Sequence, residues 1–136
     1  MPPSPHFLQP LFARDAGSPA DWGLYVADRN IVIASHLEGA FDSTSRNKGL
    51  LGRDGLATGS ALIIAPSNGV HTFAMRFAID LIFAGRDGTV LKLKAAVPKS
   101  RIAFALRGFA VIELAAGAIA KAGVKVGDRL TVRKLQ

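Results

Sequence analysis

The turn Gly85-Arg-Asp-Gly88 and the two runs beside it constrain the fold of this chain more than any other feature. Asp-Gly is a strong signal for a tight β-turn, because glycine readily adopts the positive φ angles that such turns require. On one side, residues 79–84 are apolar apart from Asp80, and on the other side, within residues 89–97, Leu91, Leu93 and Ala95 alternate with Lys92 and Lys94. We therefore predict an antiparallel hairpin whose second strand has one buried face and a basic outer row.

Short apolar runs separated by turn residues continue this pattern along the chain. β-Branched and aromatic residues favour strands, whereas Gly, Pro, Asn and Asp favour turns. Further strands are predicted over residues 24–26, 31–34, 60–66, 109–114 and 129–135. The Ala-rich residues 115–122 predict a short helix that stops at Gly123. Ser43 or Thr44 would cap a second helix that stops at Gly52. The expected class is α+β, mostly antiparallel β in a compact barrel-like or curved sheet, with two short helices.

Length and composition fit one soluble globular domain. Of the 136 residues, 49% are hydrophobic and 20% are charged, which is typical of a chain with a buried core. Residues 1–20 hold five prolines and predict a flexible lead-in, so the domain is expected over residues 21–136. We see no transmembrane run and no signal peptide and expect a cytoplasmic protein, with a periplasmic one left open. With no cysteine, the chain has no disulfide framework and no thiolate nucleophile.

The positive charge is concentrated in the C-terminal half. Residues 1–68 hold five basic and six acidic side chains, whereas residues 69–136 hold twelve basic and four acidic ones, a net charge of +8. Such an asymmetry favours a positive face, which could attract nucleic acid, anionic lipid or an acidic partner, or could serve only solubility.

A polar group interrupts the apolar stretch 70–84, directly before the hairpin. His71 and Met75 share a face whether the stretch is a strand or a helix. Arg76 and Asp80 are charges among apolar neighbours, and a charge removed from water is costly unless it is paired. We therefore expect Asp80 to pair with an arginine, either Arg76 or one from elsewhere.

Several motifs follow one another in a specific order. They are Asn47-Lys-Gly-Leu-Leu-Gly-Arg53, Val70-His-Thr-Phe-Ala-Met-Arg-Phe-Ala-Ile-Asp80, Asp87-Gly88, Val111-Ile-Glu113-Leu with Ala116-Gly117, and Val126-Gly-Asp128. In this order and spacing, from about Trp22 to Val132, the chain resembles domain-of-unknown-function family 192, in the branch that reads His-Thr before the Met. The resemblance implies a small β-rich α+β fold and no particular activity. The positions that the family's pattern marks are Gly49, Leu50, Gly52, Arg53, His71, Met75, Asp80, Glu113, Gly127 and Asp128.

These residues define a candidate site but leave its chemistry open. The candidate ligand-binding residues are Arg53, His71, Met75, Arg76, Asp80 and Glu113. Arg53 could hold an anion or be the structural partner of Asp80 or Glu113. His71 could be a general base, or a histidine that is hydrogen-bonded within the fold. His71 and Met75 would suit copper(I), but two ligands do not make a site, so we expect no metal and no cofactor.

Two classes of function remain, and the sequence does not decide whether the protein is an enzyme. We favour a binding or accessory module for an anionic small molecule or a peptide end, and a protein partner is also open. The alternative is a small hydrolase-like enzyme in which His71 and Asp80 act as acid and base and Arg53 holds an oxyanion. A weaker alternative is nucleic-acid binding through Lys92, Lys94, Arg129 and Arg133. Nucleic acid is not the expected partner, because no nucleic-acid motif is present.

Overall fold

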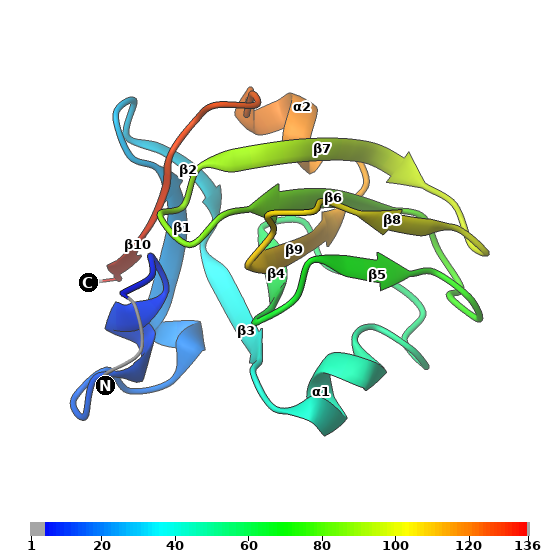
Figure 1. Cartoon of the computed structure of the whole chain (residues 1–136), viewed down its shortest axis with the longest axis horizontal. Helices are drawn as coiled ribbons and strands as arrows, with labels where there is room; N and C mark the ends of the chain where they lie inside the picture. Colours follow the sequence, from blue (N-terminus) through cyan, green and yellow to red (C-terminus); the bar gives the residue numbers. More distant parts are fainter. Residues whose placement is uncertain (1–4, 136) are drawn as a thin grey trace.

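Three β-sheets organise the fold, which comes from a computed structural model describing residues 5–135 (Figure 1). A three-stranded sheet has the order β10-β1-β2, with bounds Leu130–Lys134, Trp22–Val26 and Ile31–Ala34. A five-stranded sheet has the order β3-β4-β9-β6-β7, with bounds His36–Ala40, Ser60–Ile64, Ala110–Ala115, Ile79–Ala84 and Val90–Val97. The ribbon of β5 (Gly69–His71) and β8 (Ile102–Phe104) forms the third sheet. Among the described strands, all pairs are antiparallel except β3 with β4.

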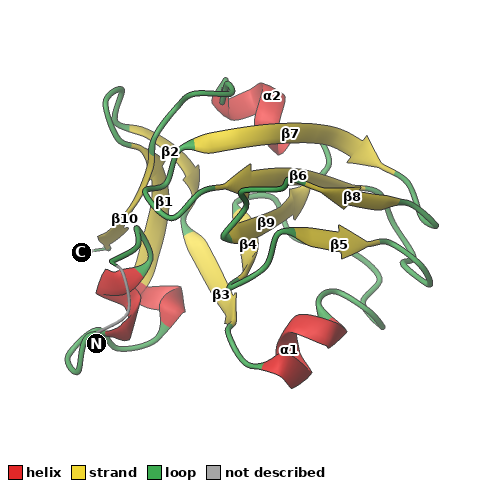
Figure 2. Ribbon diagram, viewed as in Figure 1, coloured by secondary structure: helices red, strands yellow, loops and turns green. Residues whose placement is uncertain are grey.

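The helices are short and lie at the edges of these sheets (Figure 2). They are α1 (Ser43–Lys48), α2 (Ala118–Ala122) and two 3₁₀ turns, Gln9–Phe12 and Pro19–Asp21. The predicted α+β class, mostly antiparallel with two short α-helices, is confirmed. Within residues 5–135 the sheets do not close into a barrel.

The predicted hairpin is formed by β6 and β7. Gly88, with φ of +88°, donates its N–H to the carbonyl of Gly85, and Gly85 donates to the carbonyl of Thr89. The turn therefore uses glycine where the backbone requires a positive φ. Helix α1 differs in detail from the prediction, because Asp42 caps it through the N–H of Ser45 and it ends at Gly49, three residues before Gly52.

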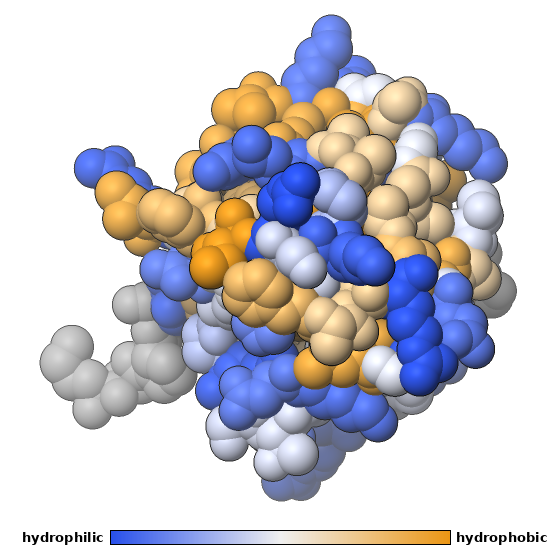
Figure 3. All heavy atoms as spheres, turned by 90° about the vertical axis from the view of Figure 1, so that its right-hand side faces the viewer, coloured by the Kyte–Doolittle hydropathy of each residue, from blue (hydrophilic) through white to orange (hydrophobic). Residues whose placement is uncertain are grey.

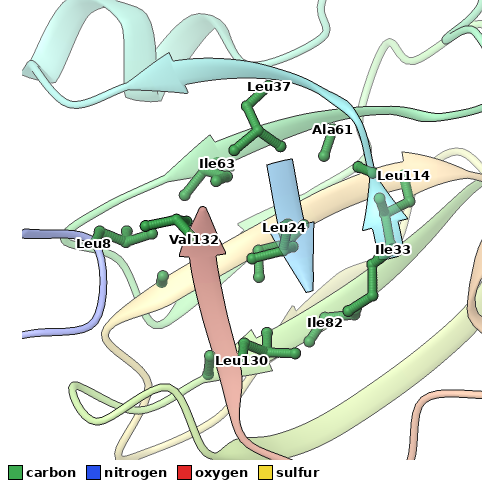
Figure 4. Packing of buried hydrophobic residues seen from close by; sticks show 14 of the residues in the cluster. Leu8, Leu24, Ile33, Leu37, Ala61, Ile63, Ile82, Leu114, Leu130 and Val132 are labelled. Atoms are coloured by element: carbon green, nitrogen blue, oxygen red, sulfur yellow. The ribbon is translucent and has the colours of Figure 1, made fainter. Parts of the chain in front are cut away.

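The five-stranded sheet separates two hydrophobic clusters. Side chains of β1, β2 and β10 converge with alternate residues of β4, β6 and β9 on one face, as Figure 4 shows for Leu24, Ile82, Leu114 and Leu130. The remaining alternate residues, such as Leu81 and Phe83 of β6, form the second cluster on the other face. Because successive side chains of a strand point to opposite faces, the register decides which cluster each polar residue of this sheet adjoins.

Much of the expected lead-in packs against the first cluster. Leu8, Leu11 and Ala16 are buried, and Phe7 donates its N–H to the carbonyl of Arg86 at 2.7 Å. The prolines that suggested flexibility include Pro10 and Pro19, which occupy first turns of 3₁₀ helices, where a missing N–H costs nothing. Residues 1–4 of the expected lead-in lie outside the described part of the chain.

Candidate functional site

A pocket of about 330 Å³ lies between α1, the loop that follows it, and the free side of β5. Strands β4 and β9 contribute Ile64 and Glu113 to its lining. It brings together three of the six predicted site residues, His71, Met75 and Glu113. The complete lining is Arg46, Asn47, Lys48, Gly49, Leu50, Leu51, Ile64, Ser67, Gly69, Val70, His71, Met75 and Glu113.

Glu113 is the most unusual residue of this pocket. It belongs to β9, where its neighbours across the sheet are Leu62 of β4 and Leu81 of β6. Both leucines belong to the second hydrophobic cluster, so the carboxyl emerges among apolar side chains. Glu113 is only 4% exposed, and its Oε1 atom has no hydrogen-bond partner within residues 5–135. An unpaired buried oxygen is rare in native proteins and calls for an explanation.

Burial raises the pKa of Glu113 to about 7, because the carboxylate form loses its hydration. The positive charge of Arg53 opposes this rise in pKa but does not cancel it. Near neutral pH the side chain is therefore present both as an acid, which donates one hydrogen bond, and as a carboxylate, which only accepts.

Basic side chains also line the pocket. Arg46 and Lys48 come from the last turn of α1, where a basic side chain also complements the helix dipole. Arg46 is held in place by a 3.0 Å hydrogen bond from its Nη1 to the carbonyl of Phe41. Gly49 forms the wall next to Glu113, since a Cβ on Gly49 would lie 3.5 Å from Oε1, and its φ of +49° and ψ of −127° suit only glycine. The pocket thus combines a buried carboxyl group with basic side chains.

Thr72 fixes the segment that carries His71 and Met75. The Thr72 side chain is buried and donates from Oγ1 to the carbonyl of Pro98 at 2.6 Å, while it accepts the N–H of Arg101 at 2.8 Å. Its carbonyl accepts the N–H of Met75 at 3.1 Å. The stretch 70–84 is therefore neither one strand nor one helix, because β5 ends at His71 and a tight loop returns Met75 to the same pocket.

Asp80 lies away from this pocket. In the regular register of β6 with β9, Asp80 is opposite Leu114, whereas Glu113 is opposite Leu81. Leu114 belongs to the first cluster and Leu81 to the second, so the two carboxyl groups emerge on opposite faces of the sheet. The expected pairing of Asp80 with an arginine is replaced by three backbone hydrogen bonds. Its Oδ1 accepts from Ala96 at 2.8 Å, and its Oδ2 accepts from Gly117 at 3.1 Å and from Ile119 at 2.9 Å.

These contacts indicate a structural role for Asp80. Its carboxylate binds the start of α2, which has no side-chain cap of its own, and the irregular point of β7 at Ala96, where φ is +50°. A carboxylate with three N–H donors is well satisfied without an ion pair. The hydrolase alternative, which needs His71 and Asp80 together, has no support in this geometry.

The two predicted arginines lie beside the pocket and not in its lining. Arg53 forms an ion pair with Glu38, with Nη1 and Oε2 2.8 Å apart, and both side chains are partly exposed. This is a structural pairing of the kind the sequence left open, but with a partner on β3 in place of Asp80 or Glu113. Arg76 forms an exposed ion pair with Asp54 at 2.7 Å.

Three of the four basic residues of the nucleic-acid alternative are divided between two sheets, and Arg129 directly precedes β10. Lys92 and Lys94 lie on β7, whereas Arg133 lies on β10, over the ring of Tyr25. Arg129 forms an exposed ion pair with Asp87, with Nη2 and Oδ2 3.5 Å apart. These four residues therefore do not form the continuous row of free cations that nucleic-acid binding would need.

Sequence reasoning missed Arg46, Lys48, Ser67 and Thr72. The first two stand on either side of Asn47, where a family motif begins, and Thr72 lies inside the His-Thr motif. Among the described residues, no group of three or more His, Cys, Asp or Glu side chains is placed to hold a metal ion. In the same part of the chain, no helix has the length and apolarity needed to cross a membrane.

The family model of DUF192, described as "Uncharacterized ACR", matches residues 26–132. The chain therefore belongs to domain-of-unknown-function family 192. Five of the positions marked by the family's pattern line the pocket, namely Gly49, Leu50, His71, Met75 and Glu113.

Two solved structures share the fold. One is a protein of unknown function from Novosphingobium aromaticivorans, with a TM-score of 0.69 and 24% identity over 80% of this chain and 81% of that chain. The other, from Sinorhizobium meliloti, is described as a candidate transcription regulator, with a TM-score of 0.70 and 23% identity over 82% of this chain and 91% of that chain. No curated protein sequence matches the chain. At these identities the two structures define the fold alone.

Proposed function

We propose that this protein is a binding module whose pocket above Glu113 takes a small organic anion that carries a hydroxyl group. The single observation that carries the proposal is the Glu113 Oε1 atom, which is buried and has no partner in the described chain, in a residue that lines the pocket. Leaving a buried polar atom unpaired costs about 1–3 kcal/mol, and a ligand that satisfies it recovers this free energy on binding.

Two kinds of side chain in the pocket specify the ligand. Glu113 exists in both protonation states near neutral pH, and a hydroxyl can donate to the carboxylate or accept from the acid. Arg46, Lys48 and His71 line the same pocket and favour an anionic group in the ligand. Hydroxy acids and sugar phosphates have this combination. A peptide carboxyl terminus offers an N–H beside its carboxylate and is the second form that the pocket chemistry allows.

The pocket is suited to binding more than to turnover. Its volume is at the lower end of the range for small-molecule sites. The lining includes no cysteine, and Ser67, its one hydroxyl, is engaged with Gly69, donating to the carbonyl at 2.9 Å and accepting the N–H at 3.4 Å. We therefore assign no nucleophile.

A thermal-shift screen followed by calorimetry tests the proposal. The panel contains hydroxy acids, sugar phosphates, amino acids and short peptides, and each ligand is tested with the wild type, Glu113→Gln and Glu38→Gln. A ligand at 100 times its Kd adds about 2.7 kcal/mol to the free energy of unfolding, which raises Tm by several degrees.

Glu38→Gln is the matched control, because Glu38 is a half-exposed carboxylate outside the pocket lining. We expect one hydroxylated anion to stabilise the wild type and the control and to lose at least tenfold in affinity with Glu113→Gln. The proposal is rejected if no compound of the panel binds, or if the active compound binds Glu113→Gln as tightly as the wild type.

A further inference from the structure

The outer face of the β5–β8 ribbon is apolar and exposed. Ile102, Phe104 and Leu106 alternate along β8 and its extension with Ala103, which packs into the second cluster. Their exposed fractions are 69%, 55% and 85%, which are high for side chains of this size. Phe73, also exposed, stacks on His71, which is opposite Ile102 in the ribbon, and so extends the same face. We call these four residues, Phe73, Ile102, Phe104 and Leu106, the ribbon face.

Basic residues flank the ribbon face along the chain, and the segments that build it contain no acidic residue. Lys99 and Arg101 precede β8, and Arg107 follows Leu106; all three are exposed. Lys92 reaches across from β7, with Nζ 5.6 Å from the centre of the Phe104 ring and 2.9 Å from the Phe104 carbonyl. No Asp or Glu occurs between residues 55 and 79 or between residues 88 and 112. Figure 3 shows apolar and strongly hydrophilic residues side by side on the side of the molecule toward which β5 and β7 point.

We propose that the ribbon face docks on the surface of an anionic lipid bilayer. The four apolar side chains would enter the boundary between headgroups and acyl chains, and Lys92, Lys99, Arg101 and Arg107 would lie at the level of the lipid phosphates. Exposed apolar side chains or cations alone bind a membrane surface weakly, whereas the two together bind an anionic membrane surface. Membrane docking would also explain the positive charge of the C-terminal half, which the ligand pocket does not explain.

The composition of the face favours lipid over the other partners of a basic surface. Single-stranded nucleic acid is held by bases stacked on aromatic rings, but the two most exposed side chains here, Ile102 and Leu106, are aliphatic. A second copy of this chain would bring the same cations against themselves, so a self-complementary dimer through this face is opposed by charge repulsion. The inference is independent of the proposed ligand pocket.

Vesicle flotation of the full chain tests the inference. Wild-type protein is mixed with vesicles of phosphatidylcholine alone, or of phosphatidylcholine with phosphatidylglycerol at three to one, at low and at high salt. We expect binding to the anionic vesicles, at least tenfold weaker binding to the neutral ones, and weakening as salt rises. An Ile102→Ser/Leu106→Ser variant should lose about tenfold or more in affinity for the anionic vesicles.

Val126→Ser is the matched control, since Val126 is 62% exposed in a turn away from the ribbon. It should bind like the wild type, and circular dichroism should show that all variants melt normally, because only exposed side chains change. The inference is overturned if the wild type does not float, if the double variant floats as well as the wild type, or if only a Lys99→Gln/Arg101→Gln variant loses binding. Light scattering and an oligothymidine binding assay complete the test. A wild-type dimer that the double variant dissociates, or oligonucleotide binding without flotation, would also overturn it.

Discussion

Replacing Glu113 with Gln should remove a pH dependence of stability that this buried carboxyl creates. In the folded protein its pKa is about 7, against an ordinary value of 4.5 that applies to the unfolded chain. Between these two values the unfolded state releases the proton and the folded state keeps it. Folding stability from this group is therefore complete below pH 4.5 and is lost as the pH rises through 7.

The size of the effect follows from the two pKa values. One pKa unit corresponds to about 1.4 kcal/mol. The rise of the Glu113 pKa from 4.5 to about 7 therefore lowers the contribution of Glu113 to the free energy of unfolding by about 3 kcal/mol between pH 4 and pH 8. Gln has nearly the same shape and does not titrate. Asp42, Asp87 and Asp128 have lowered pKa values and change the free energy of unfolding only below about pH 4. These three acids and His6 are present in both proteins, so their effects cancel in the comparison.

Urea denaturation at pH 5.0, 6.0, 7.0 and 8.0 measures this difference. The free energy of unfolding of the wild type minus that of Glu113→Gln should fall by about 2–3 kcal/mol from pH 5 to pH 8. If the two proteins keep parallel pH profiles across that range, the carboxyl is hydrated in the folded state and our description of the pocket fails.

Three other substitutions test the described contacts by urea denaturation. Asp80→Ala should cost about 2–4 kcal/mol, because it leaves the buried N–H of Ile119 and the partly buried N–H groups of Ala96 and Gly117 without an acceptor; a loss under 1 kcal/mol would contradict this. Gly49→Ala should cost about 1–3 kcal/mol through backbone strain, whereas Gly55→Ala, where nothing lies within 4 Å of the new Cβ, should change stability by less than about 0.5 kcal/mol; equal effects would contradict it. Leu24→Ala should cost about 2–5 kcal/mol at the centre of the first cluster, and a neutral result would show that this cluster is not packed as described.

The sequence predicted most of the strands and the hairpin, because alternation and turn residues are local signals. It missed β3, since His36-Leu-Glu-Gly-Ala40 has weak strand propensity and is held by its parallel partner β4. It also missed β5 and β8, which are three residues long and are fastened by the hydrogen bonds of Thr72. Pairing between residues distant in the chain, and not local propensity, makes these strands.

The candidate site was predicted in part for the same reason. His71, Met75 and Glu113 were named from the sequence, and the structure brings them together in one pocket. Asp80 was named on the rule that a buried charge needs an opposite charge, but here the donors are backbone N–H groups up to 39 residues away. Only the strand register reveals that Asp80 and Glu113 emerge on opposite faces. Arg46 and Lys48 line the pocket because the last turn of α1 lies beside it, which no local pattern indicates.

The most direct test of the central claim is a map of backbone amide chemical shifts by NMR during titration with the hydroxylated anion that the screen selects. We predict saturable shifts that concentrate at Arg46–Leu51, Gly69–His71 and Glu113, and that disappear in Glu113→Gln. Shifts that concentrate elsewhere, for example along residues 99–107, or that persist in Glu113→Gln, would contradict the claim that the pocket above Glu113 binds the ligand.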